Sequence, residues 1–100
     1  MTTTIQDNGK QLVAFFEGRL DTAAAIATAE AVKPLLEAEG KDIILDCSKL
    51  EYISSSGLRI FLSIRKDASA HGSKVVVRSI NADIRQVFAM TGFISLFEIQ

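Results

Sequence analysis

The sequence has a single cysteine, a single proline, no tryptophan and almost no net charge. One cysteine excludes an internal disulfide and favours a reducing compartment. Eleven basic and twelve acidic side chains leave a formal charge of -1, so the basic field that attracts nucleic acid is lacking. The longest apolar run near the start, Leu12 to Phe16, is too short for a signal-peptide core or a membrane span. We therefore expect a cytoplasmic protein that binds neither nucleic acid nor membrane.

What the sequence does contain is the composition of a packed core. It has 100 residues, 48% of them hydrophobic and only six of them glycine. This length corresponds to one domain, and the apolar content excludes a disordered or fibrous chain. We therefore predict a single domain over residues 1–100, and its near-neutral charge at this size favours a monomer.

Turn residues and apolar spacing outline the first half of the chain. Thr2 to Gln6 and Gln11 to Glu17 are predicted strands around the turn Asp7-Asn8-Gly9, since Asn-Gly is the strongest short-range hairpin signal. Asp21 is a predicted N-cap of a helix that runs to about Glu39 and is kinked or divided by Pro34. Apolar and small residues at helical spacing predict its buried face: Thr22, Ala25, Ile26, Ala29, Val32 and Leu36.

The second half alternates buried strands with helices. Asp42 to Asp46 and Lys74 to Arg78 each contain a continuous apolar run, which is typical of a strand covered on both faces. A helix over Ser55 to Ala70 separates them, a third helix spans about Asn81 to Met90, and Phe93 to Ile99 adds a last short strand. This order predicts an α/β fold, with a single mixed sheet of four to five strands and three or four helices packed on it.

The segment that leads into the second helix carries three consecutive serines. With Ser54 as the N-cap, Ser55 and Ser56 occupy the first two helical positions, beside unpaired backbone N–H groups at the positive end of the helix dipole. Gly57 keeps the first turn free of bulk, which would let the backbone of another protein approach closely. A phosphate on such a hydroxyl would be tolerated by the fold and would repel a docked partner. Serines at a helix start also serve as plain caps, and spacing alone favours that role.

Three segments, in the right order, resemble the STAS domain of the bacterial anti-sigma factor antagonists. Gly18-Arg19-Leu20-Asp21 resembles the family's Gly-x-Leu-Asp before the first helix. Leu45 to Leu58 resembles its strand, loop and phosphorylation segment, which usually ends Asp-Ser-Ser/Thr-Gly-Leu. Val87 to Phe93 resembles the end of its third helix, with a Thr-Gly-Leu/Phe stop. These segments are spread over most of the chain.

The resemblance implies a function by protein binding and a switch at Ser55, the serine that follows the family's usual Asp. It implies two partners: a cognate anti-sigma factor, often a serine kinase with a histidine-kinase-like ATPase fold, and a phosphatase. ATP and Mg²⁺ belong to that kinase, so no cofactor is implied here. Ser54 stands where the family usually has Asp, which keeps a cap but removes a carboxylate beside the acceptor hydroxyl. The residues expected to contact the partner are Asp21, Ser54, Ser56, Gly57 and Arg59.

Two other functions are weighed against this one. An enzyme with a serine nucleophile needs an oriented base, but the only histidine, His71, follows a predicted helix of sixteen residues, which places it roughly 24 Å from Ser55. The chain also lacks a nucleophile-elbow motif, a phosphate-loop lysine motif and the ligands of a zinc site, so we predict that it is not an enzyme. The second alternative is a STAS module of another system, either transporter-associated or a stressosome subunit, that binds its partner constitutively.

Overall fold

Five strands form one mixed sheet in which they lie in chain order, β1-β2-β3-β4-β5. The computed structural model describes residues 1–100. Strands β1 (Thr2–Asp7) and β2 (Gln11–Leu20) pair antiparallel. Strands β3 (Asp42–Ile53), β4 (Val75–Arg78) and β5 (Glu98–Ile99) continue the sheet, and every further neighbouring pair is parallel. The predicted mixed α/β sheet is confirmed, with five strands.

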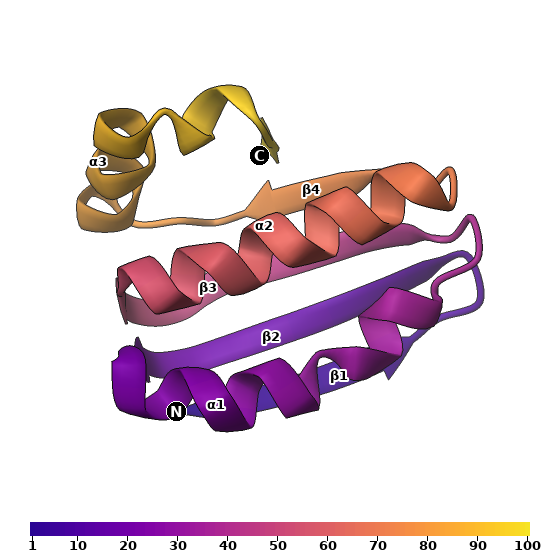
Figure 1. The fold of residues 1–100 in the computed structure, drawn as a ribbon, viewed down its shortest axis with the longest axis horizontal. Coiled ribbons are helices and arrows are strands. Elements are labelled where there is room, and N and C mark those ends of the chain that lie inside the picture. Colours follow the sequence, from indigo (N-terminus) through magenta and orange to yellow (C-terminus); the bar gives the residue numbers. More distant parts are fainter.

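Three α-helices accompany this sheet. Helices α1 (Thr22–Ala31) and α2 (Ser55–Ala70) run across the same face of the sheet, and α3 (Ala82–Thr91) lies beyond the end of β4 (Figure 1). The main core of 21 buried residues includes the rings of Phe16, Phe61 and Phe88. No helix combines the length and the apolarity that crossing a bilayer requires.

The predicted hairpin between the first two strands is confirmed. Its turn is held by two side chains, because Gly9 N–H donates to Asp7 Oδ1 at 2.9 Å and Gln11 N–H donates to Asn8 Oδ1 at 2.9 Å. Gly9 has a φ of 92°, a left-handed conformation that glycine adopts without steric cost. Local sequence signals therefore fix the register in which β1 adds to the sheet.

Pro34 divides the long helix that was predicted after Asp21. Helix α1 ends at Ala31, and a 3-10 helix (Lys33–Glu37) that contains the proline follows it. Because proline has no N–H to donate to the preceding turn, the α-helical hydrogen bonds cannot continue through it. The predicted break near Val32 to Lys33 is confirmed.

The predicted buried face of this helix is partly wrong. Ala25 and Val32 are buried as expected, and Thr28 and Leu35 are buried beside them. Ile26 is 78% exposed, although it was placed in the buried stripe. The exposed members of that stripe are Thr22, Ile26, Ala29 and Leu36. Only one residue of α1, Glu30, is charged, so apolar spacing alone does not distinguish the buried face.

We expect the substitution Ile26→Gln to change the free energy of unfolding by less than about 0.5 kcal/mol, the usual range for a surface position. The physical reason is that the side chain already lies in water. Urea unfolding of the two proteins measures the difference. A loss of more than about 2 kcal/mol, typical of truncating a core residue, would instead place Ile26 in the core.

Three strand boundaries also differ from the prediction by more than one residue. Strand β2 was expected to end at Glu17 but extends to Leu20. Strand β3 was expected to end at Asp46 but extends to Ile53, directly before the serines. Its pairing with β2 shifts register between Phe15 and Glu17, and this irregularity breaks the alternation that would have marked the extra residues as strand. The last strand was expected over Phe93 to Ile99, but a 3-10 turn takes its first part and only Glu98–Ile99 pairs with β4.

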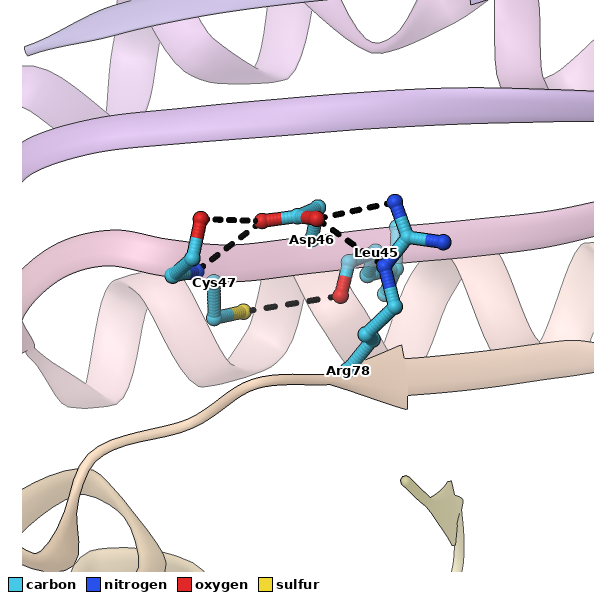
Figure 2. Close-up of polar contacts among 5 residues, drawn as sticks. Leu45, Asp46, Cys47 and Arg78 are labelled. Atoms are coloured by element: carbon cyan, nitrogen blue, oxygen red, sulfur yellow. Dashed lines mark hydrogen bonds and ion pairs between the residues drawn. The ribbon is translucent and has the colours of Figure 1, made fainter.

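The other face of the sheet carries no helix and is organised around an ion pair. At its centre Val13, Ile44 and Val76 form a small buried cluster. Beside them Asp46 of β3 faces Arg78 of the neighbouring strand, with Asp46 Oδ2 at 2.9 Å from Nε and 2.8 Å from Nη2 (Figure 2). This ion pair links Arg78, at the carboxyl end of β4, to the neighbouring strand β3.

The second oxygen of Asp46 holds the start of the irregular part of β3. Asp46 Oδ1 accepts hydrogen bonds from Ser48 N–H at 3.0 Å and from Ser48 Oγ at 2.7 Å. Burial disfavours the charged carboxylate, but the hydrogen bonds from Ser48 and the guanidinium of Arg78 outweigh it, so the pKa of Asp46 lies below its ordinary value. Cys47 lies between Asp46 and Ser48 in the sequence and is buried. Burial raises the pKa of its thiol to about 12 and keeps the thiol unreactive.

Candidate functional site

Three helices begin at one edge of the sheet, where the parallel strands β2, β3 and β4 end. Each starts with an N-cap whose side chain accepts a hydrogen bond from a backbone N–H in the first turn. Asp21 accepts from Ala24 at 2.8 Å, Ser54 from Gly57 at 3.2 Å, and Asn81 from Ile84 at 2.8 Å. The predicted caps at Asp21 and Ser54 are confirmed. The positive N-terminal ends of three helices therefore lie at this edge of the molecule (Figure 1).

The first two of these helix starts are joined directly. Leu20 and Ile53, the last residues of β2 and β3, are partners in the sheet. The backbone N–H of Ser54 donates to the carbonyl of Leu20 at 2.8 Å. Asp21 and Ser54 therefore follow neighbouring strand ends, and the sequence-predicted residues of the two motifs are brought together in one place.

The three serines differ sharply in what their hydroxyls can do. Ser54 is only 8% exposed, and its hydroxyl oxygen caps the helix. Ser56 is half-buried. Ser55 is exposed at the first helical position, where the backbone N–H groups have no partner within the helix. Of the three, Ser55 is the one whose side chain another molecule can reach freely.

The structure places Gly57 and Ser54 beneath the exposed surface at this edge. A Cβ atom on Gly57 would lie 2.7 Å from Cγ of Leu20 and 2.9 Å from Cγ1 of Ile53. The close approach predicted there is thus made by the protein's own core, and Gly57 is buried rather than offered to a partner. Ser54 likewise faces inward. Both residues are buried beneath Ser55: Gly57 packs on Leu20, and Ser54 caps α2.

Arg59 is the charged group that follows Ser55 by one helical turn. It is exposed, as expected of a residue on the outer face of α2. The first turn of this helix contains no acidic residue, so nothing there opposes a negative charge on the Ser55 hydroxyl. Asp21, at the neighbouring helix start, uses its Oδ1 atom as a cap.

Sequence reasoning missed one exposed pair at this edge. The guanidinium carbon of Arg19 lies 4.4 Å from the centre of the Tyr52 ring, and Tyr52 is 40% exposed. Arg19 stands two residues before the cap Asp21, and Tyr52 stands two residues before the cap Ser54. These matching positions on neighbouring parallel strands were the available signal. Tyrosine and arginine are both enriched among the residues that contribute most of the binding energy of protein interfaces.

The only histidine lies away from this site. His71 is the C-cap of α2, and its Nδ1 atom is 2.9 Å from the carbonyl oxygen of Asp67. Ser55 begins the same 16-residue helix, so about 24 Å of helix separates the two. The histidine is therefore out of reach of the serine, and the site offers a surface with an accessible hydroxyl.

The sequence profile of the STAS domain family matches residues 2–100. The chain belongs to the STAS domain family. The match covers every element of the structure, from β1 to β5. This STAS domain therefore has the predicted fold.

Named relatives of this STAS domain are anti-sigma factor antagonists. BtrV of Bordetella bronchiseptica, which is assigned that description, is 27% identical over 99 residues, or 99% of this chain and 85% of that protein. An anti-sigma-B factor antagonist of Listeria monocytogenes is 26% identical over 86 residues, or 86% of this chain and 75% of that protein. The fold is also that of the Bacillus cell fate determinant SpoIIAA in its phosphorylated form, with a TM-score of 0.74 at 17% identity, over 99% of this chain and 91% of that one.

Proposed function

We propose that this STAS domain is an anti-sigma factor antagonist that acts by reversible protein binding. In the unphosphorylated form it binds a cognate anti-sigma factor with serine-kinase activity, and the sigma factor is released. Phosphorylation of Ser55 by that kinase ends the binding, and a phosphatase restores it. The observation that carries the proposal is the position of Ser55, exposed at the first residue of α2 beside two serines with more buried side chains. The relatives named as antagonists support it.

A phosphate on Ser55 would switch binding without unfolding the domain. It adds about -1.5 to -2 charges at neutral pH, next to free N–H groups and the positive end of a helix. The fold therefore tolerates the group, whereas a partner docked over Ser55 meets an unpaired charge. Disrupting a buried interfacial charge pair costs roughly 2–5 kcal/mol, which is enough to release the partner.

The proposed binding surface consists of exposed or half-buried residues at the starts of α1 and α2. From the residues predicted by sequence it keeps Asp21, Ser55, Ser56 and Arg59. We add the stacked pair of Arg19 and Tyr52, which lies on the strands leading into both helices. Ser54 and Gly57 support this surface without being exposed on it: Ser54 caps α2, and Gly57 lets α2 pack closely on Leu20.

The test is binding to the purified anti-sigma serine kinases of the organism that encodes this chain. We expect one of them to bind the wild type, and Ser55→Asp to bind it at least tenfold more weakly, a difference of about 1.4 kcal/mol. Ser69→Asp is the matched control, because Ser69 is exposed near the far end of the same helix. It should bind like the wild type, and Ser55→Asp should melt at nearly the same temperature as the wild type. Equal affinity for Ser55→Asp and wild type would reject the switch.

Intact mass spectrometry tests the modification itself. After incubation with the bound kinase and Mg-ATP, we expect the wild type to gain one phosphate and Ser55→Ala to gain none. A phosphate on Ser55→Ala would show that another residue is the phosphorylation site. A wild type that binds the kinase but is never phosphorylated would show that binding is constitutive. Should the partners recovered from cells be transporter or stressosome subunits, the antagonist function is wrong.

A further inference from the structure

Arg59 is a cation without a partner on the exposed side of α2. It takes part in none of the five ion pairs of the protein. Two other arginines are already engaged: the Arg19 guanidinium stacks on Tyr52, and Arg65, further along the helix, donates to the carbonyl of Leu96. Arg59 is therefore free to bind an anion that arrives nearby.

Helix geometry places Ser55 within reach of Arg59. Residues four apart on a helix are surface neighbours, with Cβ atoms about 5–6 Å apart. Every Cα–Cβ bond also tilts toward the N-terminus of its helix, so the side chain of Arg59 leans over the turn that begins at Ser55. An acidic group four residues before a basic one is the favourable order of such a pair. A phosphate on Ser55 would stand in that acidic position.

The geometry points to Arg59 as the residue that clamps the phosphate of phosphorylated Ser55 against the N-terminus of α2. The guanidinium matches two phosphate oxygens with two parallel N–H bonds, while the free backbone N–H groups of the first turn face the same group. This inference rests on the proposed function for the modification itself, but the clamp is a property of the phosphorylated chain alone.

With this clamp, a single phosphorylation would weaken partner binding in two ways. In the unphosphorylated protein, Arg59 is exposed beside Ser55 and available to contact the anti-sigma factor. Once the Arg59 guanidinium binds the phosphate, it can no longer contact the anti-sigma factor, and the phosphate adds a negative charge to the same surface. Phosphorylation then removes an attraction as well as adding a repulsion.

The experiment places phosphoserine at position 55 during translation, so that no kinase is needed. The second pKa of the phosphate, ordinarily near 6, is then followed by ³¹P NMR in the wild type, in Arg59→Gln and in Lys66→Gln. A bound guanidinium favours the doubly charged phosphate and lowers this pKa. We expect Arg59→Gln to raise it by about 0.3–0.7, the size appropriate to an exposed charge pair, and 1 M salt to erase most of the difference. Lys66→Gln removes an exposed positive charge from the same helix and should leave the pKa unchanged.

The other charged groups at this edge are the same in all three proteins. They include Asp21 at the start of α1, Arg19 on β2, Glu51 near the end of β3 and Asp83 in the first turn of α3. Equal pKa values in the wild type and Arg59→Gln, or an equal rise in Lys66→Gln, would overturn the clamp. A failure of the kinase to phosphorylate Ser55 would overturn the proposed function and leave the NMR result standing.

Discussion

Replacing Gly57 with alanine is expected to lower the free energy of unfolding by about 1–3 kcal/mol, the usual cost of forcing an extra carbon into a packed core. The new Cβ atom would meet two atoms of Leu20, at 2.7 and 2.9 Å, and one atom of Ile53 at 2.9 Å. Leu20 is fully buried and Ile53 nearly so, and neither can move aside without disturbing its neighbours. At an open helical position the same change would add about 1 kcal/mol of stability.

A double-mutant cycle with Leu20→Ala isolates the cause. That substitution removes both Leu20 atoms that the new Cβ would meet, so Gly57→Ala should cost less in its presence than in the wild type. Urea unfolding of the four proteins gives the coupling. A Gly57→Ala protein as stable as the wild type, or more stable, would mean that Gly57 is not pressed against Leu20.

The functional importance of this contact lies in the spacing of two helix starts. Leu20 is the residue before Asp21, and Gly57 lies in the first turn that begins with Ser55. Packing Gly57 on Leu20 therefore sets how closely α1 and α2 begin beside each other. A larger residue at position 57 would displace Ser55 relative to Asp21, and with it the surface proposed to bind the anti-sigma factor.

The parts of the fold that sequence predicted correctly have short-range physical causes. Asn8 and Gly9 fold the hairpin by their own side chain and backbone, and Asp21 and Ser54 cap the helices that directly follow them. Pro34 breaks its helix whatever surrounds it. Each signal acts within a few residues of itself, so it can be identified without knowledge of the fold.

The parts that sequence missed depend on distant contacts. In α1, nearly every side chain is small or apolar, so the choice between burying Ile26 and burying Thr28 is made by the sheet beneath the helix. Gly57 marks a close approach in the sequence, but only the fold shows that Leu20 makes it. Arg19 and Tyr52 lie opposite each other because the pairing of β2 with β3 shifts register between Gly18 and Arg19, which no local pattern records.

The second large effect on stability is expected at Asp46, on the face of the sheet that carries no helix. We expect Asp46→Ala to lower the free energy of unfolding by about 2–4 kcal/mol at pH 7, because hydrogen bonds to a charged group contribute about 1.5–3 kcal/mol and Asp46 accepts several. The loss is smaller than that of a fully buried ion pair, since the Arg78 side chain is 39% exposed and regains water when its partner is removed. The matched control is Glu30→Ala, which breaks an exposed pair with Lys33 and should change stability by less than about 0.5 kcal/mol.

The effect of Asp46 should also depend on pH. Its pKa in the folded protein lies below the unfolded value, so its charge stabilises the fold fully above about pH 4, the ordinary pKa of an aspartate. This stabilisation is lost as the pH falls through the lowered pKa, because the carboxylate is then protonated in both states. Urea unfolding at pH 7 and at pH 2 should therefore show a wide gap between wild type and Asp46→Ala that narrows in acid. A gap of the same width at both values would mean that Asp46 acts through packing and not through its charge on Arg78 and Ser48.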